Sequence, residues 1–341
     1  MGSLDRAGHI MTDRNHLKRN FLETTPWREA IPSYLAGDAS NRSYERLQLG
    51  ATTAVLMDAP PKHGEDIRPF VKIAQHLVKH GFSAPRILAE DPDNGFLLLE
   101  DLGDARFKEV IENDETKELH LYTAATEALI ALRNTPLPAG LATYDAHHLT
   151  QMCDLAFTHY RTPLWGSDPA LWQLFTETFQ PLMEQTTVAP KVLAQRDFHA
   201  ENLIWLPERS GKANVGLLDF QDAFAGHAAY DLVSLLQDAR RDVSPTLERQ
   251  MITHYIAQTG IEAQSFETAY WRLGVQRNIR IMGVFARLSQ QYNKPKYLQF
   301  IPRVWRYICR GLDQPALHPI ADILRVALPE PTPETLEKLQ P

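Results

Sequence analysis

Three side chains that carry oxygen ligands are spaced so that a loop and a strand end would bring them together. Asp197 and Asn202 lie in a polar loop enclosed by two short apolar runs. Asp219 directly follows a third apolar run, residues 215–218, so its carboxylate is expected at the end of a strand beside that loop. Two carboxylates and an amide oxygen are hard ligands of the kind that bind Mg²⁺ together with phosphate oxygens.

Such a set supplies what phosphoryl transfer requires from a protein. The reaction needs a base that orients the attacking hydroxyl and a metal that neutralises charge on the phosphates. Asp197 is the expected base, and Asn202 and Asp219 are the expected ligands of Mg²⁺. Each residue alone would be interpreted as a turn or cap residue, but the three together at hairpin spacing favour the catalytic interpretation.

The elements before this loop predict a small antiparallel sheet. Residues 43–47 and 52–57 are strand-like runs around a Leu-Gly turn, and residues 87–89 and 96–99 flank a segment dense in turn formers. Between the two pairs, apolar residues recur at helical spacing over 67–78. The N-terminal part is therefore predicted to be a sheet with one main helix packed on it.

Beyond Asp101 the pattern changes to helices, interrupted by the hairpin that carries the candidate site. The predicted helices are residues 115–133, 146–160, 168–183, 228–240, 244–258, 263–290, 296–313 and 315–328. The sequence therefore predicts an α+β protein with a small N-lobe and a larger, mostly helical C-lobe. The expected divisions are a leader without structure at 1–14, an N-lobe at 15–101, a hinge at 100–104, a C-lobe at 105–328 and a loosely attached Pro-rich tail at 329–341.

The catalytic spacing resembles that of a known family. Asp197 and Asn202, followed after a hairpin by Asp219 and Phe220, resemble the catalytic and metal-binding segments of the protein-kinase-like fold. The short form present here is similar to the aminoglycoside phosphotransferase and choline kinase superfamily, from about residue 30 to residue 320. The resemblance implies a bilobal kinase-like fold, ATP as co-substrate, a nucleotide-binding N-lobe and a C-lobe that binds the acceptor.

Three further segments carry the same resemblance. Residues 37–44 resemble the phosphate loop of that superfamily, and residues 96–103 resemble its hinge. Asp231 lies in a segment whose aspartate braces the catalytic loop in that superfamily. The nucleotide contacts that the resemblance implies are Ser40 and Asn41 for phosphate and backbone groups of Glu100 and Leu102 for adenine.

The chain departs from the family pattern at three places, one of which is the absence of the G-x-G-x-x-G loop of protein kinases. Gln195 and Arg196 precede Asp197 where His-Gly is usual, and residues 54–60 read Ala-Val-Leu-Met-Asp-Ala-Pro, without the usual basic residue on the third strand. Lys62 follows nearby as a candidate replacement. With these departures the chain resembles the anomeric amino-sugar kinases of bacterial cell-wall recycling, which phosphorylate N-acetylmuramate and N-acetylglucosamine at C1.

The acceptor is expected to be a small molecule, and four residues are weaker candidates for holding it. An arginine can grip the carboxylate of a muramate sugar through two parallel hydrogen bonds, although its ordinary position is a solvated helix face. The interval from Asp219 to Asp231 is too short for a docking platform of the protein-kinase kind, so a protein substrate is not expected. The acceptor candidates are Asp222, Arg240, Arg241 and Arg277.

Composition restricts the partners and the location. Lys plus Arg number 35 and Asp plus Glu number 42, and the formal net charge of −7 argues against nucleic acid as a partner. No uncharged stretch is long enough for a transmembrane helix, and no obligate protein partner is implied. Cys153 and Cys309 are too few for a disulfide framework, so a reducing cytoplasm is the expected location.

Two alternatives remain open from the sequence. The same reaction on another small alcohol, such as an aminoglycoside, choline or homoserine, would fit the same motif. An inactive kinase fold that only binds nucleotide would fit the missing third-strand lysine. Such a protein would have no need for Asp197, Asn202 and Asp219 together, which favours an active enzyme.

Overall fold

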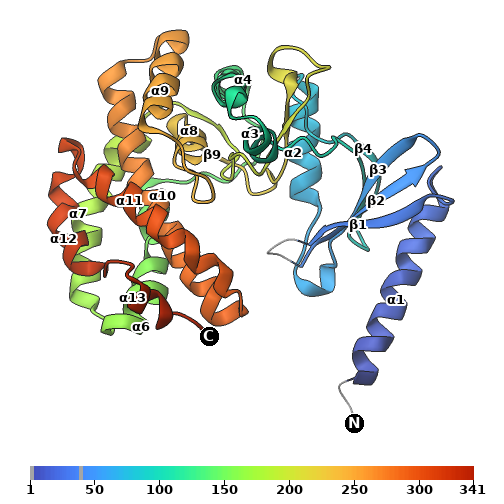
Figure 1. Ribbon diagram of the computed structural model, residues 1–341, viewed down its shortest axis with the longest axis horizontal. Helices are drawn as coiled ribbons and strands as arrows, with labels where there is room; N and C mark the ends of the chain where they lie inside the picture. The colour runs from blue at the N-terminus through green and yellow to red at the C-terminus, as the bar shows by residue number, and fades with distance from the viewer. Residues whose placement is uncertain (1–3, 38–40) are drawn as a thin grey trace. The chain divides into compact units, whose positions relative to one another are not determined.

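The computed structural model describes residues 4–37 and 41–341, with the backbone alone at residues 4–13, 36 and 37 (Figure 1). Ser40, a predicted phosphate contact, lies outside the described residues. The chain divides into two compact units. The first unit is Met1–Ala105 with Ile204–Asp222, and the second is Arg106–Leu203 with Ala223–Pro341.

The first unit is built around a five-stranded antiparallel sheet with strand order β1-β2-β3-β5-β4. Leu49 pairs with Thr52 across a tight turn, in which Gly50 has a φ of 59° that favours glycine. The strands predicted from the apolar runs are therefore confirmed, and β1 adds an edge strand before them. The strands are β1 (Ile31–Gly37), β2 (Ser43–Leu49), β3 (Thr52–Asp58), β4 (Ile87–Asp91) and β5 (Phe96–Glu100).

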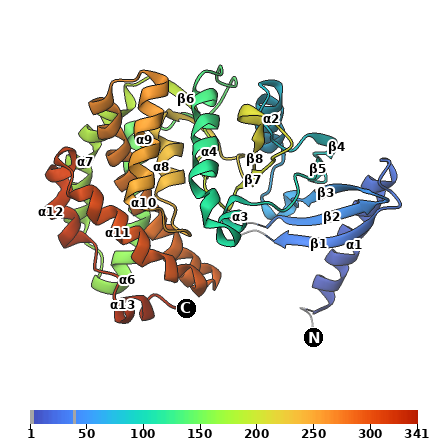
Figure 2. The same cartoon turned by 45° about the horizontal axis from the view of Figure 1, so that its top comes forward.

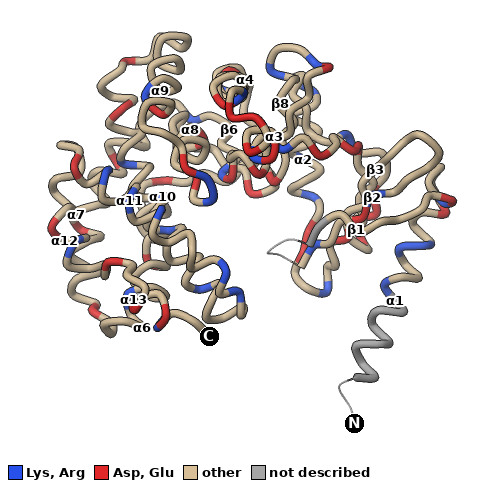
Figure 3. The backbone as a smooth tube through the Cα atoms, in the orientation of Figure 1, with Lys and Arg blue, Asp and Glu red and all other residues tan. Residues whose placement is uncertain are grey.

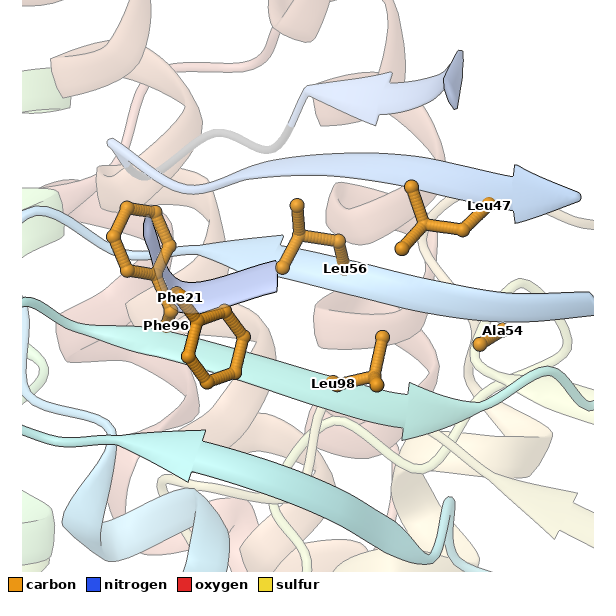
Figure 4. Packing of buried hydrophobic residues seen from close by; sticks show 6 residues of the cluster. All are labelled: Phe21, Leu47, Ala54, Leu56, Phe96 and Leu98. Atoms are coloured by element: carbon orange, nitrogen blue, oxygen red, sulfur yellow. The ribbon is translucent and has the colours of Figure 1, made fainter. Parts of the chain in front are cut away.

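One face of this sheet is covered by α1 (Leu4–Glu23). The rings of Phe21 and Phe96 stack with their centroids 5.6 Å apart, and Arg14 forms an ion pair with Asp58 at 2.5 Å. α1 therefore begins inside the segment expected to be an unstructured leader, and its later turns pack against the sheet. Figure 4 shows the buried side chains on this face, which are Phe21, Leu47, Ala54, Leu56, Phe96 and Leu98.

Strand alternation directs the neighbouring side chains to the opposite face of the sheet. Met57 of β3 and Leu97 and Leu99 of β5 point there and are buried. The helix predicted between the strand pairs is confirmed as α2 (Arg68–Lys79), so the first unit has two long helices where the sequence predicted one. The buried residues of α2 are Phe70, Ile73, Ala74 and Leu77.

A β-hairpin from later in the chain also belongs to the first unit. β7 (Leu203–Trp205) and β8 (Val215–Leu217) form it, at the positions that the apolar runs predict. The Leu217 N–H donates to the Ser83 carbonyl at 2.8 Å, and the hairpin packs on the buried side chain of Leu102. The sequence places this hairpin in the C-lobe, whereas these contacts assign it to the first unit.

The second unit is mostly helical. α4, α8, α9 and α10 pack side by side (Figure 2), and α10 is buried along most of its length, so it forms the centre of the unit. Among the described helices, none is long and apolar enough to cross a membrane. The helices are α3 (Phe107–Asn113), α4 (Glu118–Arg133), α5 (Ala146–Gln151), α6 (Thr162–Trp165), α7 (Pro169–Thr187), α8 (Ala229–Leu236), α9 (Pro245–Thr259), α10 (Ala263–Tyr292), α11 (Ile301–Leu312), α12 (His318–Ala327) and α13 (Pro333–Glu337).

Two features of the second unit differ from the expectation. β6 (Lys191–Ala194) pairs with β9 (Phe224–His227), a strand that the sequence patterns did not indicate. The Pro-rich tail is packed rather than loosely attached, because the Tyr160 hydroxyl donates to the Pro329 carbonyl at 2.7 Å and Leu339 is fully buried. The tail thus accepts a hydrogen bond from a buried hydroxyl and contributes an apolar side chain to the core.

Candidate active site

The predicted catalytic loop, residues 195–202, follows β6 and is fixed by Asp231. One carboxylate oxygen of Asp231 accepts the Gln195 N–H at 2.6 Å, and the other accepts the Arg196 N–H at 2.9 Å. Arg196 has a φ of 78°, a left-handed conformation that is costly for a residue with a side chain. Asp231 is buried in the first turn of α8, so the start of a helix holds this strained backbone in place.

Asp197 is partly exposed and lies among three arginines. Its side chain is 31% exposed, and its oxygens lie 3.8 Å from Arg196 Nε and 3.8 Å from Arg277 Nη2. Burial by itself raises the pKa of Asp197, but the charges of Arg196, Arg280 and Arg277 outweigh it, so the pKa lies below its ordinary value. The carboxylate is therefore ionised at neutral pH and is suited to accept a proton from a hydroxyl group.

Asn202 is oriented by the same loop. Its backbone N–H donates to the His199 carbonyl at 2.8 Å, and its side-chain Nδ2 donates to the Asp197 carbonyl at 2.9 Å. These contacts use the amide nitrogen, which makes the amide oxygen the side-chain atom suited to a metal. The structure therefore confirms that Asp197 and Asn202 share one loop and shows how each is held.

A network of charged side chains contacts the loop from α3 and from the segment after α8. Glu201 accepts from Lys108 Nζ at 2.8 Å and pairs with Arg240 Nε at 3.0 Å, while Arg240 Nη1 lies 3.1 Å from His199 Nε2. Burial lowers the pKa of His199, so the ring is neutral and its Nε2 accepts from the guanidinium. Sequence reasoning missed Lys108, because it lies far from the loop in the chain and no motif contains it.

Arg277, a predicted acceptor contact, is buried in α10 beside the catalytic loop. Its Nη2 donates to the Ser234 hydroxyl at 2.7 Å, which directs the guanidinium toward Asp197. The side chain is therefore part of the surroundings of the candidate base and does not lie on a solvated helix face. Asp222, by contrast, is exposed at the boundary of the first unit.

Arg241 lines a cavity of about 620 Å³ that the catalytic loop does not reach. Its walls are formed by α3 and the residues after it, by the segment before α9 and by part of α11. Figure 3 shows that the part at α3 is rich in acidic residues. Arg241 contacts Glu118 and, at 3.0 Å, the Tyr122 hydroxyl of α4. The structure therefore brings Arg240 and Arg277 to the loop but not Arg241.

In the first unit, Asp219 stands at the end of the β7–β8 hairpin, as the sequence predicts. Its backbone has a φ of 58°, and its Oδ1 accepts from Gln221 Nε2 at 2.6 Å. The next residue, Phe220, is fully buried against Phe70 of α2, with ring centroids 4.8 Å apart. These contacts fix the turn and hold the carboxylate at the strand end.

The predicted adenine contacts, Glu100 and Leu102, lie at the end of β5 and just after it. The Glu100 N–H donates to the Arg86 carbonyl at 2.8 Å, and the Glu100 carboxylate pairs with Arg86 at 3.1 Å and with Arg209 at 2.8 Å. The Leu102 side chain is buried. Both side chains therefore have structural partners within the first unit.

The two predicted metal ligands belong to different units. Asn202 belongs to the second unit and Asp219 to the first, so a metal site shared by them stays a prediction. Within the part of the chain that the structure describes, no three His, Cys, Asp or Glu side chains are grouped to hold a metal. Asn41 is exposed just before β2, and its N–H donates to Glu65 at 3.2 Å.

Comparison with known proteins decides the family. The model of the phosphotransferase enzyme family, APH, matches residues 33–266. The chain belongs to the APH family. It is 36% identical to the N-acetylmuramate/N-acetylglucosamine kinase of Caulobacter vibrioides, over 90% of this chain and 95% of that protein. It is 35% identical to the kinase of the same name from Pseudomonas aeruginosa, over 83% of this chain and 85% of that protein.

The APH-family fold is also evident from a solved structure. Choline kinase LicA from Streptococcus pneumoniae matches with a TM-score of 0.60 and 12% identity, over 88% of this chain and 99% of that one. At this identity the likeness concerns the fold alone, and it confirms the α+β, kinase-like architecture predicted from the sequence. Membership of the APH family makes the protein a small-molecule kinase, which implies a nucleotide co-substrate.

Proposed function

We propose that this APH-family kinase transfers the γ-phosphoryl group of ATP to the anomeric hydroxyl of N-acetylmuramate and N-acetylglucosamine. The observation that carries the proposal is the 36% identity, over 90% of the chain, with a kinase named for these two sugars. An anomeric hydroxyl is an alcohol group, and the chain holds a partly exposed, ionised carboxylate in the loop expected to meet it.

Asp197 is the proposed base. It accepts a hydrogen bond from the acceptor hydroxyl and takes the proton as the hydroxyl oxygen attacks phosphorus. Asp231 maintains the loop conformation through its two backbone contacts, so it is a positioning residue. The charges of Arg196, Arg280 and Arg277 keep Asp197 ionised, which maintains its ability to accept that proton.

Asn202 and Asp219 are the proposed ligands of Mg²⁺. The donor set fits this ion, because one carboxylate and one amide oxygen leave positions for phosphate oxygens and water. The contact of Asn202 Nδ2 with the loop backbone supports the assignment, since it orients the amide, whose oxygen is the atom that can ligate a metal. When bound, Mg²⁺ would neutralise negative charge on the phosphates of the nucleotide.

ATP is the proposed nucleotide, with its adenine held by backbone groups of Glu100 and Leu102 and its phosphates by the turn that contains Ser40 and Asn41. The structural partners of the Glu100 side chain support a backbone role at this position. A reaction that consumes ATP on a small sugar is consistent with a cytoplasmic enzyme, which is the proposed location.

Positive charge near Asp197 supports an acidic acceptor. N-acetylmuramate carries a carboxylate, and Arg240 and Arg277 both contact the catalytic loop. Because Arg277 is buried, its proposed influence on the sugar is through its charge, whereas Arg240 is partly exposed. Asp222 stays a proposed contact for sugar hydroxyls, and Arg241 is the weakest candidate because it contacts α4.

The experiment that tests this proposal is incubation with Mg-ATP and either sugar, followed by ³¹P NMR of the product. We expect a phosphate signal coupled to the anomeric proton with both N-acetylmuramate and N-acetylglucosamine. Phosphate transfer to choline, homoserine or an aminoglycoside in place of these sugars would show that the acceptor is wrong. Absence of transfer to every acceptor would show an inactive kinase fold.

A further inference from the structure

The third strand of the sheet lacks a cation for the phosphates of a nucleotide. Phosphoryl transfer depends on lysine, arginine or metal charges held against the phosphates. β3 contains neither lysine nor arginine. Met57 stands where the family pattern has a basic residue, and it is fully buried. If the proposed function holds, a residue from another element supplies this charge.

The register of the sheet places Arg42 beside that position. Tyr44 of β2 pairs with Met57 of β3, and directly paired residues of antiparallel strands point to the same face. Arg42 stands directly before β2 and two residues ahead of Tyr44, and the strand alternation, continued by one residue, directs it to the same face. This is the face opposite the one that α1 covers, and it is the face on which a third-strand lysine would have stood.

Glu65 holds the Arg42 side chain. Its Oε2 accepts from Arg42 Nε at 2.7 Å, and the two side chains are only 12% and 11% exposed. Its Oε1 accepts the Asn41 N–H at 3.2 Å, so one carboxylate fixes two consecutive residues of the turn into β2. A guanidinium has five donors in one plane, which makes a contact at Nε compatible with phosphate contacts at the Nη atoms.

Asp219 lies near enough to Arg42 for their charges to interact. Burial lowers the pKa of Arg42, but the hydrogen bond to Glu65 and the charges of Tyr44, Glu65 and Asp219 outweigh it and raise the pKa. The arginine and the proposed metal ligand belong to the same unit. A polyphosphate bound through a metal at Asp219 would therefore come close to a guanidinium that stays charged.

We propose that Arg42 binds the phosphates of the nucleotide in place of a third-strand lysine, with Glu65 as its positioning residue. This inference rests on the proposed function, because it requires that the chain bind a nucleotide. Lys62, the replacement considered from the sequence, is exposed in the short segment Pro61–His63. If the Arg42–Glu65 pair had only a structural role, it would hold the turn before β2 against the segment before α2. Its loss would then not affect ligands with and without phosphates differently.

The experiment compares ligands that share adenine but differ in phosphates. Isothermal titration with ADP and with adenosine, both in Mg²⁺, is carried out on the full-length protein and on five variants, one of which is Lys62→Ala. For Arg42→Ala we expect ADP to bind about 10- to 100-fold more weakly, the usual effect of losing a charge-assisted contact, with adenosine binding unchanged. Arg42→Lys should retain part of the ADP affinity, and Glu65→Gln should lose less than Arg42→Ala.

The fourth variant, Arg14→Ala, is the matched control. It removes an arginine that pairs with an acid on the other face of the same sheet, 2.5 Å from Asp58. We expect it to lower the melting temperature without changing the affinity for ADP. If Arg42→Ala fails to fold, Arg42→Lys and Glu65→Gln, each with its melting temperature measured, carry the test.

Three results would overturn the proposal. One is wild-type ADP affinity in both Arg42 variants, another is an equal loss of ADP and adenosine binding, and the third is a phosphate-specific loss in Lys62→Ala instead. The proposed function fails separately. If the wild-type protein binds no ADP and forms no sugar phosphate, the kinase proposal is wrong. If the wild-type protein is active and Arg42→Ala binds ADP with the same affinity, only the role of Arg42 is disproved.

Discussion

Two clusters of arginines in the second unit differ in how closely they meet acids. At the cavity between α3 and α11, the acids lie within hydrogen-bond distance, with Arg306 at 3.0 Å from Asp242 and Arg310 at 2.5 Å from Glu248. At Asp197, the distances to Arg196 and to Arg277 are both 3.8 Å, beyond a direct hydrogen bond.

The difference lies in how far each carboxylate is occupied. At the cavity, each close pair gives the carboxylate a direct guanidinium partner. An acid held among arginines at longer range stays ionised and keeps its oxygens accessible. Among the described residues, Arg277 also has two guanidinium nitrogens, Nε and Nη1, without a hydrogen-bond partner. Distance, more than the number of arginines, therefore distinguishes the cluster around Asp197, the proposed base, from the cluster at the cavity.

The largest effect is expected from Asp197→Asn, which removes the acid and leaves the arginines. Without a carboxylate to accept the hydroxyl proton, kcat should fall about 10²- to 10⁴-fold, the usual contribution of a general base. The affinity for ADP should not change, because Asp197 is not among the proposed nucleotide contacts. A coupled assay of kcat and a titration with ADP check this, and kcat near the wild-type value would remove Asp197 from the mechanism.

Arg277→Gln should have a smaller effect that depends on pH. The charge of Arg277 helps to lower the pKa of Asp197, so its removal raises that pKa. The carboxylate then takes up protons at a higher pH, and the acidic limb of the profile of kcat/KM against pH should move upward. Activity should recover as the pH rises above the new limb.

The pH profile distinguishes this role from a merely structural one. Arg277 is buried and bound to Ser234, so its loss also costs stability, about 1–3 kcal/mol for buried partners left unsatisfied. A structural defect alone would lower kcat/KM by the same factor at every pH. An unshifted acidic limb in a folded Arg277→Gln variant would contradict the proposed influence on Asp197.

Local patterns explain why much of the fold and of the loop could be predicted. Short apolar runs and turn residues determine strands such as β2 and β3, and a spacing within one loop relates Asp197 to Asn202. These features depend on neighbours in the chain, so the sequence reveals them directly. The turn after β8, which carries Asp219, is predictable for the same reason.

The contacts that tune the site could not be predicted, because they join distant segments. Lys108 reaches Glu201, and Arg277 reaches Asp197 from the centre of α10, without any motif that relates them. Each arginine taken alone resembled one on a solvated helix surface. Only the packing of α10 in the second unit shows that Arg277 is buried, so its role depends on tertiary structure that residue spacing does not encode.

The smallest effect is expected from Arg241→Gln, which breaks a close pair at the cavity. This variant loses the contacts with Glu118 and Tyr122, so the free energy of unfolding should fall by about 0.5–1.5 kcal/mol. Urea unfolding measures this loss, while kcat, KM for N-acetylmuramate and the acidic limb should stay at wild-type values. If KM for N-acetylmuramate rose tenfold while KM for N-acetylglucosamine did not, Arg241 would be gripping the sugar carboxylate. The cluster at the cavity would then contact the acceptor as well, and the contrast between the two clusters would be lost.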